Sequence, residues 1–290
     1  MRTAIVTDSN SGITQKMAVD MGVSVIPMPF TIDGELFFED INLTREEFYQ
    51  RQADGAKILT SQPSPEEITG RWDALLEKYD DVVHIPMSSG LSGSCQTAIM
   101  LAQDYGGRVQ VVNNQRISVT MKRSVQDAME MAEKKGLNAA QIKEVLERVK
   151  MESSIYITLD TLKYLKQGGR ITPAAAAIGS LLHIKPVLQI KGERLDSFSK
   201  ARTLTQGKHV MINALRHDID TLYGGTENGT VWVYAVHAYL PEQFPAYAEE
   251  VRKAFPALQV EEDYLSLSVA CHIGPGALAI ACSKKIDGEY

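Results

Sequence analysis

The chain has 290 residues, enough for two domains of roughly 150 residues each. Its 44% hydrophobic and 23% charged residues are typical of a globular protein, and a net charge of -6 at pH 7 gives no general attraction to nucleic acid. The three cysteines, Cys95, Cys271 and Cys282, form no CxxC pattern, which argues against a disulfide framework or a thiolate metal site and fits a reducing cytoplasm.

The first half of the chain alternates short apolar runs with helical patterns. The runs predict strands over residues 3–9, 23–32, 81–87 and 108–113. Apolar residues recur at helical spacing at positions 98, 101, 102 and 105, and again at 142, 145, 146 and 149. Strands that alternate with helices in this way predict a mostly parallel, doubly wound sheet. No run approaches the roughly 20 apolar residues that span a bilayer, and none resembles a signal peptide, so we expect a soluble cytoplasmic protein.

The pattern changes at about residue 155. The segment "IYITLD" predicts a strand, a helix is expected to end at the pair Gly168 and Gly169, and an alanine-rich helix is expected to open at Thr172 and Pro173. Further on we expect a hairpin centred on residues 191–193, a helix over about 203–220, a strand over 230–238, a helix over about 241–254 and a final strand over 276–282. The fold class is therefore α/β, with an N-terminal α/β domain over 1–154 and a C-terminal α/β domain with a mixed sheet over 155–290.

The stretch "SSGLSGS" at residues 88–94 is rich in small residues and follows a predicted strand. In an open α/β sheet, ligands gather at the carboxyl ends of strands, where loops lead into helix N-termini. Gly90 and Gly93 allow close backbone approach and the serines offer hydroxyl donors, so an anion is the expected ligand. The alternative is that Ser92 or Ser94 only caps the following helix.

Two more polar loops follow predicted strands. In "LTSQPSPEE", Ser64, Pro65 and Glu67 predict a helix cap with proline at the first helical position. This cap leaves Thr60, Ser61 and Gln62 unexplained. The loop "TDSNSG" at residues 7–12 follows the first strand. We expect the three loops to converge on one crevice, although any nucleotide or sugar-phosphate binder would have similar loops.

Most enzyme motifs are missing from the sequence. It has no GxxxxGK[ST], no GxGxxG and no GxSxG, and its six histidines lack the spacing of metal ligands. His272 precedes "IGPGA", whose glycines would let an imidazole lie beside a bound anion. Arg170, after the Gly168–Gly169 pair, either complements the helix dipole or neighbours an anion. The pattern at these two positions leaves both alternatives open.

Six pieces of the sequence together resemble the DegV family of bacterial fatty-acid-binding proteins. They are "TDSNSG", "VIPMPFTIDGELFFED", "TSQPSP", "SSGLSGS", "YLKQGGRI" with "LLHIKPVLQIKGE", and "HIGPGALAI", in this order over nearly the whole chain. The resemblance implies two α/β domains with a tunnel between them that holds a long-chain fatty acid. It also implies a non-catalytic carrier, acting in phospholipid synthesis, that presents the fatty acid to a fatty-acid kinase for acyl-phosphate formation. Transient membrane contact is compatible with this role.

The resemblance also assigns residues. The threonine of "TSQP" is Thr60 and the serine of "LSG" is Ser92, which would hydrogen-bond the fatty-acid carboxylate. Ser61, Arg170 and His272 would lie near that head group, and Arg202 would belong to the kinase interface. No cofactor and no metal are expected beyond the fatty-acid ligand.

The sequence departs from the family pattern at "NNQRISVTMKRS" and at Cys95, which bears on tunnel shape and chain preference. The alternative function is an enzyme acting on a phosphorylated small molecule, such as a sugar phosphate or a substrate of a dihydroxyacetone-kinase-like protein. The two functions differ in their ligand.

Overall fold

The computed structural model describes residues 2–172, 184–192 and 194–286. They divide into two compact units. The first lies within Met1–Lys150 and Ser266–Ser268, and the second within Met151–Leu265 and Val269–Asp287. The predicted alanine-rich helix after Thr172 and Pro173, and the apolar stretch that it carries, lie outside the described residues.

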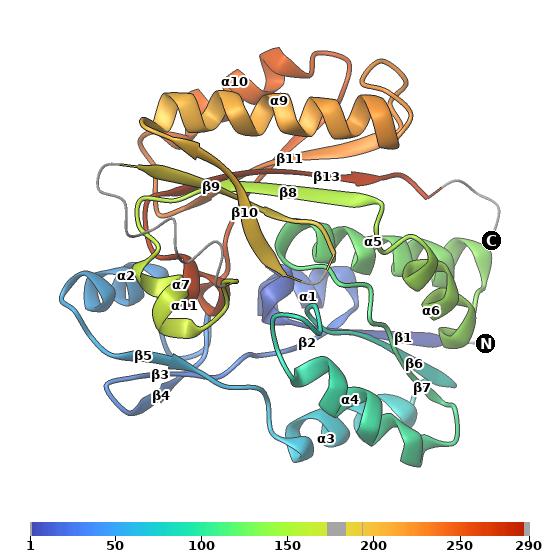
Figure 1. The fold of residues 1–290 in the computed structure, drawn as a ribbon. Helices are drawn as coiled ribbons and strands as arrows, with labels where there is room; N and C mark the ends of the chain where they lie inside the picture. The colour runs from blue at the N-terminus through green and yellow to red at the C-terminus, as the bar shows by residue number, and fades with distance from the viewer. Residues whose placement is uncertain (1, 173–183, 193, 287–290) are drawn as a thin grey trace. The chain divides into compact units, whose positions relative to one another are not determined.

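The first unit is built on a four-stranded parallel sheet, as the alternation of strands and helices predicts. The strand order is β2–β1–β6–β7, with every neighbouring pair parallel (Figure 1). The bounds are β1 Thr3–Asp8, β2 Ser24–Ile26, β6 Asp81–Ile85 and β7 Val109–Val111. All five residues of β6 are buried, as expected for a strand with neighbours on both edges and helices on both faces.

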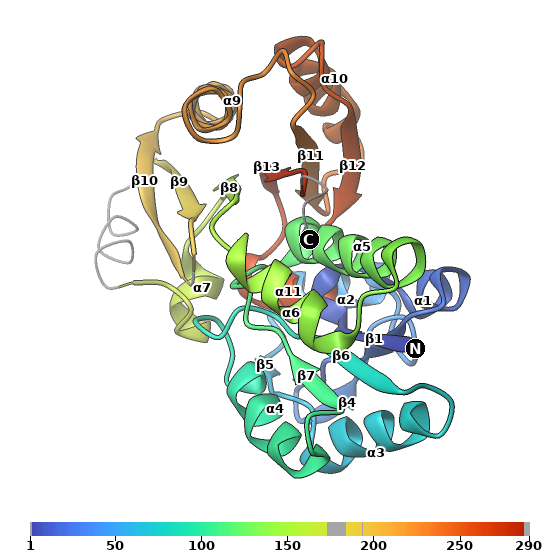
Figure 2. The ribbon, with the colours of Figure 1, turned by 90° about the vertical axis from the view of Figure 1, so that its right-hand side faces the viewer.

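Helices cover both faces of this sheet (Figures 1 and 2). One face packs against α3 (Pro65–Leu76) and α4 (Ser94–Ala102), which bury Trp72 and Cys95 against β1, β6 and β7. The other face packs against α5 (Ser118–Lys135) and α6 (Ala139–Arg148). A short 3-10 helix, η1 (Ser9–Ser11), and α1 (Gln15–Met21) follow β1. The doubly wound arrangement predicted for the first half is confirmed.

The predicted single strand over residues 23–32 is wrong: the chain forms two strands in two different sheets. Pro27 and Pro29 lack the backbone N–H that a ladder needs, so pairing stops at Ile26 and resumes at Phe30. The second sheet is antiparallel, in the order β4–β3–β5, with bounds β3 Phe30–Ile32, β4 Glu35–Phe37 and β5 Ile58–Thr60. Between β4 and β5 lies α2 (Arg45–Ala53), whose Phe48 packs edge-on against Phe30.

The second unit is built on a six-stranded mixed sheet in the order β10–β9–β8–β13–β11–β12. Only the β11–β12 pair is parallel. The bounds are β8 Ser153–Thr158, β9 Lys185–Ile190, β10 Leu195–Ala201, β11 Val231–Ala238, β12 Val260–Tyr264 and β13 Ala277–Lys284. The antiparallel pairing of β9 with β10 confirms the predicted hairpin.

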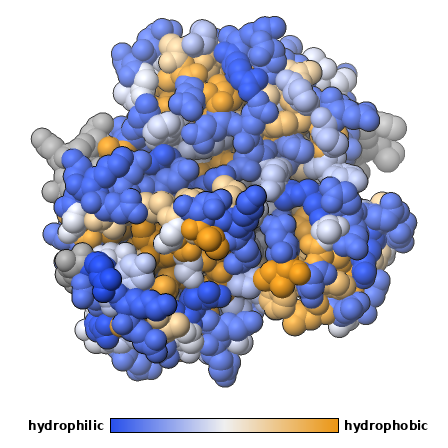
Figure 3. Space-filling view, turned by 180° about the vertical axis from the view of Figure 1, so that it is seen from behind, coloured by the Kyte–Doolittle hydropathy of each residue, from blue (hydrophilic) through white to orange (hydrophobic). Residues whose placement is uncertain are grey.

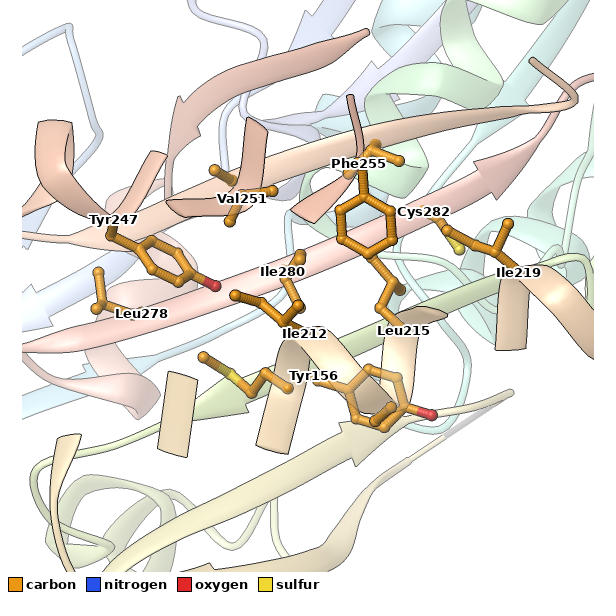
Figure 4. Close-up of a cluster of buried hydrophobic side chains, with 14 of the residues drawn as sticks. Tyr156, Ile212, Leu215, Ile219, Tyr247, Val251, Phe255, Leu278, Ile280 and Cys282 are labelled. Carbon is orange, nitrogen blue, oxygen red and sulfur yellow. The ribbon is translucent and has the colours of Figure 1, made fainter. Parts of the chain in front are cut away.

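The core of the second unit lies between this sheet and two helices on one of its faces, α9 (Leu204–Leu222) and α10 (Phe244–Ala254) (Figures 1 and 2). Figure 4 shows how aromatic and aliphatic side chains on the helix side meet those of the strands, among them Leu215 from α9, Phe255 just after α10 and Ile280 from β13. The described part of this unit also contains a short helix, α7 (Lys163–Gly168). Another short helix, α11 (Leu267–Ile273), begins in the segment Ser266–Ser268 of the first unit and continues into the second.

The face shown in Figure 3 is mostly polar, with several apolar patches. No helix in the described part of the chain combines the length and apolar character needed to cross a membrane.

Candidate functional site

The strand order of the parallel sheet reverses between β1 and β6. After β1 the chain moves to β2 on one side, and after β6 it moves to β7 on the other. The loops that leave the two strands therefore diverge, and ligands of open α/β sheets bind at such a switch point. The predicted loops "TDSNSG" and "SSGLSGS" leave these two strand ends.

A buried carboxylate joins the two loops. Asp8, the last residue of β1, is 2% exposed, and its Oδ2 accepts the Met87 N–H at 2.9 Å. Its Oδ1 accepts the Asn10 N–H at 2.9 Å and the Asn10 Nδ2–H at 2.7 Å. Burial raises the pKa of Asp8 to about 6, against the lowering effect of the hydrogen bonds from Met87 and Asn10.

The loop after β6 forms a compact turn that ends at Ser92. The Ser88 carbonyl oxygen accepts the N–H groups of Leu91 at 3.0 Å and Ser92 at 3.2 Å. The half-buried Ser92 hydroxyl oxygen accepts the Ser94 N–H at 3.2 Å, so its proton remains available to a different acceptor. Gly93 is the N-cap of α4 and no side chain caps that helix at its N-cap position. Neither serine occupies the N-cap position, but the Ser92 hydroxyl accepts the N–H of Ser94, the first residue of α4, so the alternative that Ser92 caps this helix stays open.

Thr60 is the last residue of β5, and its place follows from strand register. It pairs with Phe30 of the central strand β3, and on the other edge of β3 the same residue pairs with Phe37 of β4. Paired residues point to the same face of a sheet, so Thr60 shares the face on which Phe30 is fully buried. The exposed Ser61 continues the chain and donates its N–H to the Pro29 carbonyl at 3.1 Å. The predicted cap by Ser64, with Pro65 at the first helical position of α3, is confirmed.

Gln62 brings the Thr60 loop against the first turn of α4. Its Nε2 lies 3.2 Å from the Thr97 Oγ1, and a Cβ on Gly93 would lie 3.3 Å from its Oε1. Two of the three predicted loops therefore meet at the N-terminus of α4, and the third meets them through Asp8 and Met87. The sequence drew attention to Gln62 without explaining it, and this contact explains it.

In the second unit, Arg170 and His272 lie close together. The Arg170 Nη1 donates to the Gly168 carbonyl at 2.5 Å, while the His272 imidazole lies where a Cβ on Gly168 would stand. Gly169, with φ of 66°, ends α7 in the left-handed conformation that glycine favours. Burial and the charge of Arg170 lower the pKa of His272 to about 4, so the imidazole is neutral at neutral pH.

The segment that follows His272 packs closely against α7 and the loop before it. A Cβ on Gly274 would overlap the ring of Tyr164, and a Cβ on Gly276 would lie 2.6 Å from an oxygen of Asp160. Asp160 also forms an ion pair of 2.5 Å with Lys185 on β9. The glycines of "HIGPG" therefore allow the chain to lie against α7 and the loop before it.

Arg202 lies in the chain between β10 and α9. It is exposed, and its backbone N–H donates to the Gln206 side chain at 2.8 Å. Among the described residues, no three His, Cys, Asp or Glu side chains gather in a way that could hold a metal ion. The sequence reasoning missed Asp8 as a site residue. The signal was present, because Asp8 ends an apolar strand and lies in the polar stretch "TDSNSG".

Comparisons with known proteins agree on one family. The model of a family described as "Uncharacterised protein, DegV family" matches residues 2–285. A DegV domain-containing protein of Deinococcus radiodurans is 30% identical over 97% of this chain and 98% of that protein. A DegV family protein of Thermus thermophilus, whose structure is described by its fatty acid binding, has a TM-score of 0.88 and 30% identity, with 98% of this chain and 100% of that one covered. DegV of Bacillus subtilis, described as a fatty acid binding protein, has a TM-score of 0.86 and 27% identity, with 98% and 100% covered.

Proposed function

Because the chain belongs to the DegV family, we propose that it binds a long-chain fatty acid and presents the carboxylate to a fatty-acid kinase, which forms the acyl phosphate. The fatty-acid-binding descriptions of the Thermus and Bacillus proteins support the ligand. The observation that carries the proposal on this chain is the meeting of the Thr60 and Ser92 loops through Gln62 and Thr97.

In this proposal, the hydroxyls of Thr60 and Ser92 hydrogen-bond the carboxylate, with Ser61 nearby. Thr60 is the last residue of β5, on the buried face of the small sheet, and a polar loop begins after it. Ser92 has a hydroxyl proton to donate because its oxygen already accepts the Ser94 N–H. A ligand with an apolar chain and one anionic head suits such a boundary.

We assign Arg170 and His272 to the same head group. The guanidinium of Arg170 is a planar cation that favours a nearby carboxylate. The imidazole of His272 is neutral, since its pKa is lowered to about 4, so it acts as a hydrogen-bonding group and adds no second positive charge. Together they would stabilise an ionised head group without repelling each other.

The acyl chain and the head group contribute differently to affinity. Burial of an acyl chain yields about 0.8 kcal/mol per methylene, so about fifteen methylenes yield roughly 12 kcal/mol before ordering costs. A carboxylate removed from water must first recover its hydrogen bonds. The polar residues therefore fix the position of the head group, and the chain supplies most of the affinity.

The proposed role is non-catalytic. A protein that cradles a nucleotide triphosphate commonly uses a glycine-rich phosphate loop with a lysine, and this sequence has no such motif. We propose that the kinase brings the nucleotide and that Arg202 belongs to the surface that meets it. Phospholipid synthesis is the process that would consume the acyl phosphate.

Native mass spectrometry of the purified protein tests the ligand. We expect a bound mass equal to that of a long-chain fatty acid, which is lost after delipidation and restored by added palmitate. A protein that purifies empty, ignores palmitate and binds a sugar phosphate would instead support the alternative of an enzyme acting on phosphorylated small molecules. Acyl-phosphate formation by the isolated chain with ATP would overturn the non-catalytic role.

A further inference from the structure

We propose that Asp8 is a positioning residue for Ser92, and that head-group binding requires Asp8 to be ionised. This inference rests on the proposed function, because Ser92 is its target. It concerns the loop "TDSNSG", to which the proposed function assigns no role.

The first step is the tie between two adjacent strand ends. β1 and β6 pair in parallel up to Thr7 and Ile85, after which their loops diverge. Asp8 spans the divergence by accepting the Met87 N–H, and Asn10 strengthens the tie because its Nδ2 lies 3.0 Å from the Met87 sulfur. Three donor hydrogens converge on the two carboxylate oxygens of one buried side chain.

The second step leads from Met87 to the Ser92 hydroxyl. The next residue, Ser88, is held on its other side by donation of its N–H to the Arg116 carbonyl at 2.9 Å. The Ser88 carbonyl then accepts the Ser92 N–H, and the Ser92 oxygen accepts the Ser94 N–H. A shift of the peptide at Met87 therefore moves a short chain of hydrogen bonds that ends at the proposed head-group hydroxyl.

The third step is the requirement for charge. An ionised carboxylate only accepts hydrogen bonds, so it suits three donors. The protonated acid carries an O–H donor, which would point at one of these three N–H groups in place of an acceptor. The hydrogen-bond partners of Asp8 are uncharged: Met87 from the β6 loop and Asn10 from η1. The helix α5 packs on η1 and β1 and carries Arg123, which is buried and paired with Asp127 and Glu130. On α4, burial raises the pKa of the Cys95 thiol to about 12, so it carries no charge near neutral pH. Burial raises the pKa of Asp8 to about 6, against the lowering effect of the hydrogen bonds from Met87 and Asn10, so Asp8 takes up a proton as the pH falls through about 6.

The experiment measures palmitate affinity from pH 5 to pH 8 for the wild-type protein, Asp8→Asn and the matched control Asp81→Asn. Asp81 is also buried, but it lies at the opposite end of β6 and accepts the Ala139 N–H at 2.9 Å. At pH 8 we expect Asp8→Asn to bind palmitate on the order of tenfold more weakly than the wild type, since the substitution removes the charge that strengthens the three hydrogen bonds to residue 8. Asp81→Asn should keep wild-type affinity even if its melting temperature falls.

The pH profile separates positioning from a general loss of stability. The ratio of wild-type to Asp8→Asn affinity should fall toward one as the pH drops through 6, because the wild type then loses the same charge. An Asp8→Asn variant with wild-type affinity, or a ratio that does not change with pH, overturns the inference. If Asp8→Asn does not fold, the affinity of the wild type for hexadecanol is measured over the same pH range instead. The hydroxyl head group of hexadecanol does not titrate, so any pH dependence comes from the protein. A step near pH 6 supports the inference and a flat profile overturns it.

The outcomes also distinguish this inference from the proposed function. If the wild type binds neither palmitate nor hexadecanol at any pH, the proposed function fails. If the wild type binds palmitate and Ser92→Ala weakens that binding while Asp8→Asn does not, the function stands and the positioning role of Asp8 fails.

Discussion

The imidazole of His272 fills the space beside Gly168 that a side chain on that residue would need. Gly168 is the last residue of α7, and its carbonyl oxygen accepts a hydrogen bond from Arg170. The positions of the imidazole and the guanidinium thus both depend on the backbone at residue 168. A single added methyl group tests this dependence.

Gly168→Ala should displace the His272 imidazole and weaken palmitate binding. A Cβ at this position overlaps the ring, and overpacking of this kind costs about 1 to 3 kcal/mol, so the melting temperature should fall as well. The control is Gly70→Ala on α3, where nothing lies within 4 Å of the added Cβ. Alanine favours a helix more than glycine does, so this control should keep or slightly raise the melting temperature. Equal palmitate binding by both variants would remove His272 from the head-group site.

The double variant Thr60→Ala with Ser92→Ala should lose palmitate affinity by roughly a hundredfold or more, because each of the two charge-assisted hydrogen bonds contributes about 1.5 to 3 kcal/mol. The fold should persist, since both side chains lie at loop ends and neither is fully buried. Thr69→Ala, whose hydroxyl donates to the Pro65 carbonyl on α3, controls for the loss of a hydroxyl. Retention of lipid through purification and thermal melting are the measurements. Unchanged retention by the double variant would end the carboxylate assignment.

Arg202→Ala should bind palmitate normally and lower the rate of acyl-phosphate formation with the cognate kinase. Arg202 is exposed, so its charge should act by speeding the association of the carrier with the kinase. Dissolved salt screens this electrostatic attraction. The difference from wild type should therefore be greatest at low ionic strength and shrink as salt is added. Lys200→Ala, an exposed cation on β10, is the control. Turnover equal to wild type at every carrier concentration would place Arg202 outside the interface, and lost lipid binding would place it in the site.

Glu39 should make stability fall as the pH rises through neutrality. Its carboxylate forms an ion pair of 3.1 Å with Arg45 and accepts the Leu267 N–H at 2.7 Å, at the first residue of α11. Burial nevertheless raises its pKa from 4.5 to about 7, despite the lowering effects of Arg45 and Leu267. The folded protein then holds this proton more tightly than the unfolded chain, so the stabilising contribution is complete below about pH 4.5 and is lost as the pH rises through 7.

The measurement is the free energy of unfolding of wild type and Glu39→Gln from pH 5 to pH 8. Glutamine carries no titrating proton, so the wild-type value should decline relative to the variant by up to about 1.4 kcal/mol per pH unit within the window. Glu46→Gln, an exposed carboxylate on α2, controls for the loss of one negative charge. If wild type instead gains stability over the variant as the pH rises, the ion pair with Arg45 outweighs burial and the pKa of Glu39 is lowered.

Local chemistry made several elements predictable from the sequence. The cap of α3 by Ser64 and Glu67 depends on only four consecutive residues. The β9–β10 hairpin follows from two strand-like segments on either side of Lys191 and Gly192. The sequence also indicated which loops carry polar groups at strand ends. Its motifs pointed to a family that the comparisons confirm.

Only the tertiary structure decided which of these groups meet. The small sheet of β3, β4 and β5 was not predicted, because strands of three residues carry too little periodicity, yet its register sets the face on which Thr60 lies. The link from Asp8 to Met87 spans 79 positions, and the packing of His272 on Gly168 spans 104, the difference between 272 and 168. Helix caps and hairpins depend on neighbours in the chain, whereas these contacts depend on strand order and glycine packing, which no local pattern contains.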